Sequence, residues 1–261
     1  MTLHCLVVDP PRPGLALPGL VDGPLDADGA AELYAASIAD AMAASAGSGG
    51  ELLVNYPAAE QLPAEHRSDG SPEAELRALA EEALADVGDV RFEVQVGSSF
   101  AARAGNAVTH LLDEEDEDSV AVLRGTAPTL ARTALDGAAM KLRRHGAVVG
   151  PGTGGRVAYL GLSEPFDFEG TYGPPTGEDG SGRESEVEVL VDRAVDADRE
   201  VAFLPVHPVI EDEAGLATLV AEVRARLRAG RNVPSKTAEA VVELGLRVVE
   251  DGGVRRVVAG E

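Results

Sequence analysis

The sequence predicts an α/β protein, with a mostly parallel sheet flanked by helices and a small helix-hairpin addition at the C-terminus. Short apolar runs of strand length alternate with segments of helical periodicity along most of the chain, as in successive β-α-β units. Hydrophobic residues make up 44% of the 261 residues, enough for a sizeable core. Because the alternation changes after Pro234, we expect one domain over 1–232 and an appendage over 233–261.

Each predicted strand is a short apolar run bounded by Gly, Pro or polar residues. The first run stops at a segment with three prolines, Pro10, Pro11 and Pro13, which exclude regular structure there. The strands expected along the chain are 3–8, 51–56, 90–96, 120–124, 147–150, 157–162 and 201–205.

The predicted helices carry recognisable start signals. Asp26 or Asp28 can cap the first, and Pro72 stands at the favoured first turn of the second. After Pro234 a short helix is expected before a hairpin. The helices expected between the strands are 28–44, 72–85, 99–112, 128–145, 184–195 and 214–229, and the hairpin pairs 246–249 with 254–258.

The composition is strongly acidic. There are 45 Asp and Glu against 22 Lys and Arg, a formal net charge of −23, and Lys141 and Lys236 are the only lysines. Such a surface keeps a protein soluble through hydration and self-repulsion, and we expect a halophilic source. A surface for a cationic partner is the alternative, although the acid is spread along the whole chain. Nucleic-acid backbones would be repelled, so no nucleic-acid partner is expected.

Cys5 is the one cysteine and lies in an apolar run, which predicts a small core residue in a reducing compartment, not a nucleophile. The N-terminal apolar run is too short for a signal peptide and lacks a basic flank. No stretch approaches the roughly 18 apolar residues of a membrane span. We therefore expect a cytoplasmic protein with no membrane partner.

Ligands of open α/β sheets bind at the carboxyl ends of the strands, which restricts the search to the loops 9–20, 97–103, 124–129 and 150–156. Each loop contains Gly, Ser, Thr or Arg, which can present backbone N–H groups or a guanidinium to phosphate. A single arginine is usually a surface residue, but four at one edge of an acidic protein would form a local positive basin. These are Arg12, Arg103, Arg124 and Arg156.

Other features allow two interpretations each. The Gly-rich segment 150–155 resembles a phosphate-cradling loop, yet it matches neither the Walker nor the dinucleotide pattern and is more often a turn. The six acidic residues 113–118 could hold a metal but are more often a solvated turn. The Gly/Pro-rich loop 163–183 is long enough for a mobile flap. His207, between two prolines, is the histidine to watch, with a structural role as the alternative.

Several short motifs occur in one order along the chain: Pro11-Arg12-Pro13-Gly14, Ala31-Glu32-Leu33-Tyr34, Gln95-Val96-Gly97 with Arg103, Gly150-Pro151 before Tyr159-Leu160-Gly161-Leu162, and Ile210-Glu211-Asp212 with Leu216. In this order they resemble a family of GT-A-fold glycosyltransferase-like proteins that includes the arsenosugar-biosynthesis glycosyltransferase, and more distantly phospholactate guanylyltransferases. The resemblance runs from the N-terminus to about residue 220. It implies a nucleotide-diphospho-sugar transferase fold, of a divergent, haloarchaeal type.

This chain departs from the family at the positions to which the resemblance assigns phosphate and metal binding. Where the family has Lys-Thr-Arg-Leu to face the phosphates, this chain has Leu-Pro-Gly-Leu at 17–20. The family's Ser-Asp-x-Pro-Asp-Leu turn would supply the metal-binding Asp, but Thr126 and Thr129 stand at its carboxylates. Gly154 stands at the Asp of the Gly-Gly loop. Mg²⁺ or Mn²⁺ is expected for the family; here its Asp ligands are replaced, and no metal ligand is predicted.

Losing the cation that neutralises a departing nucleoside diphosphate costs roughly a hundred- to thousandfold in rate. We therefore predict a catalytically degenerate domain that binds a nucleotide or nucleotide sugar, with no catalytic residue assigned and a protein partner as a further option. The candidate nucleotide-binding residues are Asp9, Arg12, Gly14, Arg103, Arg124, Thr126, Thr153, Gly154 and Gly155.

Two alternatives remain open. One is an active, metal-independent glycosyl- or nucleotidyltransferase in which Arg12, Arg103 and Arg124 replace the cation. Asp9, or an acid of the 163–183 loop, would then serve as its base. The other is a non-catalytic structural or interaction protein whose site has closed.

Overall fold

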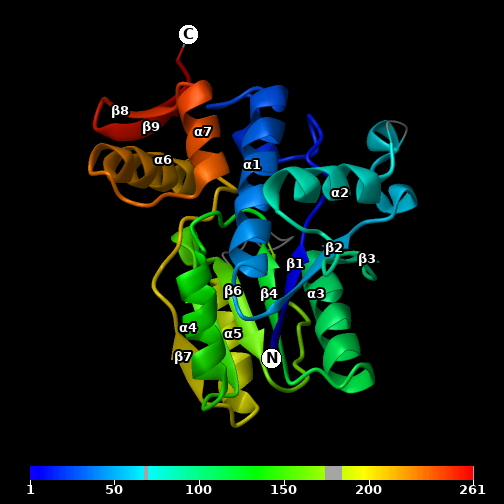
Figure 1. The fold of residues 1–261 in the computed structure, drawn as a ribbon. Helices are drawn as coiled ribbons and strands as arrows, with labels where there is room; N and C mark the ends of the chain where they lie inside the picture. The colour runs from blue at the N-terminus through cyan, green and yellow to red at the C-terminus, as the bar shows by residue number, and fades with distance from the viewer. Residues whose placement is uncertain (68–69, 174–183, 261) are drawn as a thin grey trace.

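The computed structural model describes residues 1–67, 70–173 and 184–260 and has a central seven-stranded sheet (Figure 1). Its strands are β1 (Thr2–Val7), β2 (Glu51–Tyr56), β3 (Arg91–Val94), β4 (Ser119–Arg124), β5 (Ala147–Pro151), β6 (Val157–Leu162) and β7 (Val201–Phe203), in the spatial order β3-β2-β1-β4-β6-β5-β7. Within this sheet β6 runs antiparallel to both of its neighbours, and the other described pairs are parallel. The predicted α/β class with a mostly parallel sheet is confirmed.

Helices cover both faces of the sheet. They are α1 (Ala27–Ala46), α2 (Pro72–Ala83), α3 (Phe100–Thr109), α4 (Arg132–Leu142), α5 (Glu186–Asp196), α6 (Glu213–Arg228) and α7 (Ser235–Glu243). Buried side chains of α1, α2, α4, α6 and α7 form one apolar cluster, and those of α3 and α5 belong to a second. Of the two proposed caps of α1, Asp26 is the one used, since its side chain accepts a hydrogen bond from the N–H of Gly29 at 2.8 Å.

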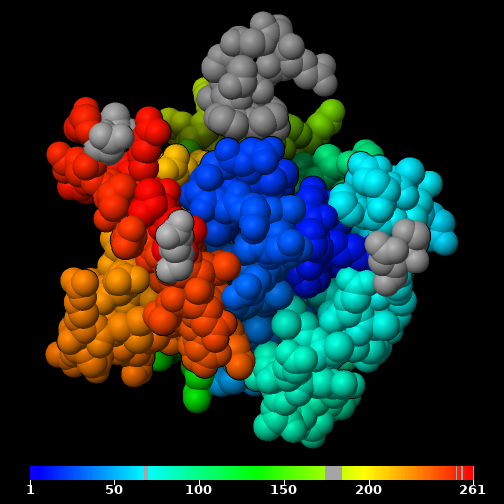
Figure 2. All heavy atoms as spheres, turned by 90° about the horizontal axis from the view of Figure 1, so that it is seen from above, coloured from blue at the N-terminus to red at the C-terminus, as the bar shows by residue number. Residues whose placement is uncertain are grey.

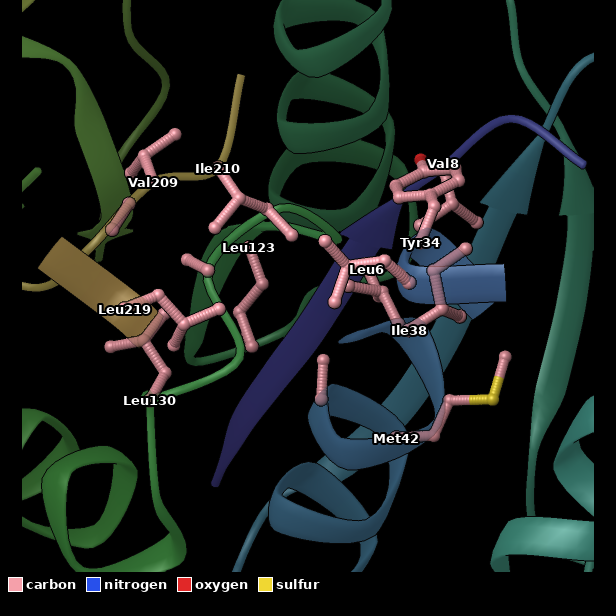
Figure 3. Packing of buried hydrophobic residues seen from close by; sticks show 14 of the residues in the cluster. Leu6, Val8, Tyr34, Ile38, Met42, Leu123, Leu130, Val209, Ile210 and Leu219 are labelled. Carbon is pink, nitrogen blue, oxygen red and sulfur yellow. The ribbon is translucent and has the colours of Figure 1, made fainter. Parts of the chain in front are cut away.

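Strand β1 shows why the strands read as continuous apolar runs. Successive side chains of a strand point to opposite faces, so Leu6 packs in the α1 cluster whereas Cys5 and Val7 pack in the α3 cluster. Figure 3 shows Leu6 beside Ile38 of α1. Because both faces are covered by helices, most side chains of both sets are apolar, and His4 is a buried exception that contacts Ser45.

Some predicted boundaries move for local reasons. Helix α4 begins at Arg132 and not at 128, because residues 124–131 form turns in which Ala127 N–H bonds to Arg124 C=O and Leu130 N–H bonds to Ala127 C=O. Strand β7 ends at Phe203, two residues before Pro205, which has no N–H for a ladder. Within the acidic segment 113–118, Glu115 is ion-paired with Arg91 at 2.9 Å.

The C-terminal segment consists of α7 and the hairpin β8 (Arg247–Asp251) and β9 (Val254–Val258), as predicted. It packs against the rest of the chain: α7 lies against α1, and the hairpin lies against α6 (Figures 1 and 2). The guanidinium of Arg224 in α6 donates to the carbonyl of Leu246 at 3.0 Å. The prediction of a domain boundary at residue 232 stays a prediction. Among the described residues, no helix combines the length and apolar composition needed to cross a membrane.

Asp40 of α1 caps the first turn of α7. Its carboxylate is buried and accepts hydrogen bonds from the N–H groups of Lys236 at 3.1 Å and Thr237 at 2.7 Å. We expect Asp40→Ala to lower the free energy of unfolding by about 1–2 kcal/mol, because two helix N–H groups lose their acceptor. Denaturant unfolding measures this. Glu32→Ala, at an exposed position of the same helix, is the matched control and should change little; equal effects would contradict the cap.

His4 of β1 is buried under α1, where its Nδ1 lies 2.8 Å from Ser45 Oγ. Burial lowers its pKa from 6.5 to about 4, although Asp136 opposes the shift. Between these values the unfolded chain binds a proton that the folded chain does not, so stability must fall as the pH falls from 7 to 4. The loss should reach about 3 kcal/mol.

The measurement is the free energy of unfolding against pH for the wild type and for His4→Gln. The wild type should lose stability more steeply than the variant between pH values of about 6.5 and 4. Parallel curves in that window would show that His4 does not carry this pH dependence.

Candidate functional site

A cavity of about 600 Å³ lies at the carboxyl ends of β1 and β4, where the predicted loops converge. Apolar side chains, including Leu15 and Leu17, form part of its wall, and several charged side chains face it. Of the predicted site residues, the cavity brings together Asp9, Arg103, Arg124 and Thr126.

Asp9 lies two residues after the end of β1 and lines the cavity. Its backbone N–H donates to the hydroxyl of Tyr34 at 3.3 Å, which ties this turn to α1. Burial raises the pKa of the Asp9 carboxyl, and the guanidinium of Arg103, 3.5 Å away, opposes that shift. The carboxyl group therefore keeps its proton to higher pH than an exposed aspartate does.

Arg103 comes from the first turn of α3, whose N-terminus points into the site. Ser99 caps this helix through its hydroxyl, which accepts from the N–H of Ala102 at 3.2 Å. Gly97 precedes it with a φ of 138°, and a Cβ there would lie 2.8 Å from the backbone nitrogen of Arg103. Glycine at 97 thus lets the segment after β3 pass closely over α3, which places the Arg103 side chain beside Asp9.

Gln95 also lines the cavity and is held in one orientation. Its amide nitrogen donates to the carbonyl of Val8 at 2.9 Å and to that of Asn55 at 2.7 Å. The reversed amide would place an oxygen against two carbonyl oxygens, so Oε1 is the remaining group. The residue is 1% exposed, and among the described residues Oε1 has no hydrogen-bond partner. It is a buried acceptor without a donor.

Arg124 ends β4 and is the centre of an ion-pair network. One of its terminal nitrogens lies 2.8 Å from both carboxylate oxygens of Glu186, and the other lies 2.6 Å from Glu211 Oε1. The rings of Phe100 and Tyr172 lie 4.9 and 5.1 Å from the guanidinium carbon. We call the side chains of Arg124, Arg156, Glu186, Glu211 and Asp212 the Arg124 network.

The charges of this network hold one another ionised. Burial works against the charged form of Arg124, yet the carboxylates of Glu211 and Glu186 more than offset it, and its pKa is raised. Burial likewise opposes ionisation of Glu211, but Arg124 and Arg156 lower its pKa. Both groups therefore remain charged throughout the neutral pH range.

Arg156 enters the network from the end of the Gly-rich segment, where its Nε donates to Glu211 Oε2 at 3.0 Å and Nη1 to Asp212 at 2.6 Å. The preceding Thr153 bonds to the backbone of Val209 through its hydroxyl. Gly154 and Gly155 have φ values of 70° and 75°, and the three residues do not line the cavity. This segment is a turn that positions Arg156.

Arg12 and Gly14 lie outside the cavity lining. The guanidinium of Arg12 is buried against Glu75, with Nε at 3.0 Å from Oε2, and it donates to the carbonyls of His66 and Gly70. It ties the loop after β1 to the start of α2. The structure thus places Arg12 in a packing contact and puts Arg156 in the cavity.

The residues of this cavity do not fit the divalent cation that the family resemblance implies. The described residues contain no group of three or more His, Cys, Asp and Glu side chains arranged around a common point. Thr126, at a family carboxylate position, donates its hydroxyl to Glu211 at 3.0 Å. Thr129, at the other, lies 3.0 Å from His207 Nδ1. Neutral hydroxyls are poor ligands for a hard cation.

Sequence reasoning did not select Gln95, Tyr34 or Glu186 as site residues. Glu186 follows the capping residue of α5, so its pattern signals a helix start and not a site. For Gln95, the sequence signal that could have identified it as a site residue was its place in the motif Gln95-Val96-Gly97. Of the predicted flap at 163–183, Phe168 and Tyr172 pack in the α3 cluster, and 174–183 lie outside the described residues.

Comparisons with known proteins show which fold this architecture belongs to. Residues 67–171, less than half of the chain, match the family described as "Uncharacterized protein conserved in bacteria (DUF2064)". No curated protein matches the chain. A crystal structure from Desulfovibrio desulfuricans G20, named as a nucleotide-diphospho-sugar transferase, has a TM-score of 0.71 and 18% identity, over 93% of this chain and 97% of that one.

Two further structures are more distant. A homologue of rv0371c from Mycobacterium sp. strain JC1 has a TM-score of 0.47 and 15% identity, over 87% of this chain and 98% of its own. A cytidylyltransferase from Leptospira borgpetersenii has a TM-score of 0.48 and 10% identity, over 93% and 92%. These scores are too low to support an argument. The similarity to the structure from Desulfovibrio desulfuricans G20 shows that the chain has the GT-A-like, nucleotide-diphospho-sugar transferase fold. Its residues 67–171 match the DUF2064 family.

Proposed function

We propose that the chain binds a nucleotide or a nucleotide sugar in the cavity at the ends of β1 and β4, without the ordinary metal-dependent transfer reaction. The observation that carries this proposal is the position of Arg103, whose side chain lines this open cavity beside apolar side chains. A cationic side chain at the wall of a pocket favours a ligand with a negatively charged group such as phosphate.

The shape and chemistry of the cavity support a small-molecule ligand. Its volume of about 600 Å³ lies within the range of ligand pockets. Leu15, Leu17 and Phe100 supply apolar wall, as a base or sugar face requires, whereas Arg103 supplies hydrogen-bond donors for phosphate. The guanidinium of Arg103 lies 3.5 Å from Asp9 and its Nε donates to the Gly97 carbonyl at 3.4 Å; both contacts are long, so the side chain can turn to a ligand at modest cost.

The absence of ordinary turnover is inferred from the charges. In a metal-dependent transferase, carboxylates hold the cation that neutralises the leaving group. Here Thr126 and Thr129 stand at those positions, and Glu186 and Glu211 are engaged by arginines. Measurable transfer from a sugar nucleotide by the purified protein would overturn this part of the proposal.

Thermal stability in molar KCl, measured against a panel of nucleotides and nucleotide sugars, tests binding. A ligand at a hundred times its dissociation constant should add about 2.7 kcal/mol to the free energy of unfolding. Arg103→Gln should weaken binding about tenfold or more, because a charge-assisted hydrogen bond is lost. Arg132→Gln, at an exposed arginine of α4, is the matched control and should bind as the wild type does.

A metal-independent transferase is the second candidate, and Asp9, a half-buried carboxyl with a raised pKa at the cavity wall, favours it as the base. A base must be deprotonated, and burial raises its pKa, so kcat/KM should rise with pH at values above the ordinary 3.8. Asp9→Asn should abolish both the activity and this rise. Activity that survives alanine at both Arg103 and Arg124 would rule the mechanism out. The third candidate, a structural protein with a closed site, is disfavoured by the open cavity.

A further inference from the structure

The segment that should carry the cation's ligands contacts an acidic segment in this structure. The resemblance assigns the metal-binding Asp to the turn after β4, and the acidic segment before α6 matches an acidic motif of the same family. Thr126 of the first and Glu211 of the second are in direct contact, with 3.0 Å between Oγ1 and Oε1. The place where a divalent cation would be bound is therefore the surroundings of Glu211.

A guanidinium already fills that place. Arg124 lies between Glu211 and Glu186, with nitrogen–oxygen distances of 2.6 and 2.8 Å, and its side chain is 7% exposed. Because Phe100 and Tyr172 flank it, the group has little room to withdraw. A planar, permanently charged group with several fixed donors suits this role.

A second guanidinium engages the remaining oxygens. Arg156 donates to Glu211 Oε2 at 3.0 Å and to Asp212 at 2.6 Å, so both oxygens of Glu211 are engaged. The other oxygen of Asp212 caps α6 through the N–H of Gly215 at 2.8 Å. A divalent cation could bind here only by displacing a guanidinium and leaving it buried without its partner.

We propose that the guanidinium pair of Arg124 and Arg156 is a built-in replacement for the divalent cation, so that this site binds no divalent metal. A second part rests on the proposed function: a phosphate-bearing ligand meets these arginines instead of a metal, and its binding does not depend on Mg²⁺ or Mn²⁺. The first part concerns the protein alone and can be tested without any ligand.

The test is a titration of the wild-type chain with Mn²⁺ alone, followed by electron paramagnetic resonance of the free ion. Molar KCl screens the acidic surface, since the Debye length is about 3 Å at that ionic strength. We expect no saturable binding of one Mn²⁺ per chain. Saturable binding that disappears in Glu211→Gln, and persists in Asp116→Asn of the exposed acidic loop, would overturn the proposal.

The converse experiment removes the two guanidinium groups that lie between the carboxylates, which do not surround a common point in the described structure. Arg124→Met with Arg156→Met frees the carboxylates of Glu186, Glu211 and Asp212 while keeping similar apolar stems. This double variant should gain saturable Mn²⁺ binding, and saturating Mn²⁺ should raise its Tm by about 5 °C or more. Adding Glu211→Gln should remove the gain. A folded double variant that binds no Mn²⁺ would contradict the inference.

Should the double variant not fold, Arg156→Met alone, at a side chain that is 19% exposed, frees Glu211 Oε2 and one oxygen of Asp212 and should give a weaker gain of Mn²⁺ binding, because Arg124 remains in place. Nucleotide binding in EDTA and in Mn²⁺ tests the second part: equal affinities support it, and binding that requires Mn²⁺ overturns it. If no nucleotide binds in either condition, the proposed function fails, while the Mn²⁺ titration still decides the replacement of the cation.

Discussion

The ion pairs of Arg124 join parts of the chain that lie far apart in sequence. Its carboxylate partners are 62 and 87 residues away, at the start of α5 and before α6. Arg124 ends the buried strand β4, so its charge can be buried only if these acids reach it. The cavity between β1, α3 and β4 depends on this arrangement, because the same side chains form one of its walls.

The ratio of positive to negative side chains in this cavity differs from that of the whole chain. The chain carries a formal net charge of −23, yet in the cavity lining Arg103, Arg124 and Arg156 face Asp9, Glu186 and Glu211. A site with balanced charges in a strongly acidic protein attracts anions more than its surroundings do. The halophilic source remains a prediction from composition, and it explains the acidic surface without requiring a cationic partner.

Much of the fold could be predicted because its causes are local. The run at β1 is apolar on both faces, which a parallel sheet between two helical layers requires. Asp26 and Pro72 mark helix starts through capping and a fixed φ. The start of α4 could not be predicted, since the turns at 124–131 compete with the helix through their own hydrogen bonds.

The sequence by itself determined the α/β class, the positions of most strands and helices along the chain, and the edge of the sheet where charged side chains line the cavity. The resemblance also predicted that Thr126 and Thr129 stand at positions where family members carry carboxylates. Only the tertiary structure decided which arginines face the cavity, because a guanidinium forms an ion pair with whichever carboxylate the packing of the loops brings close to it. Arg12 pairs with Glu75 and lies outside the cavity lining, whereas Arg156 pairs with Glu211 and is part of that lining.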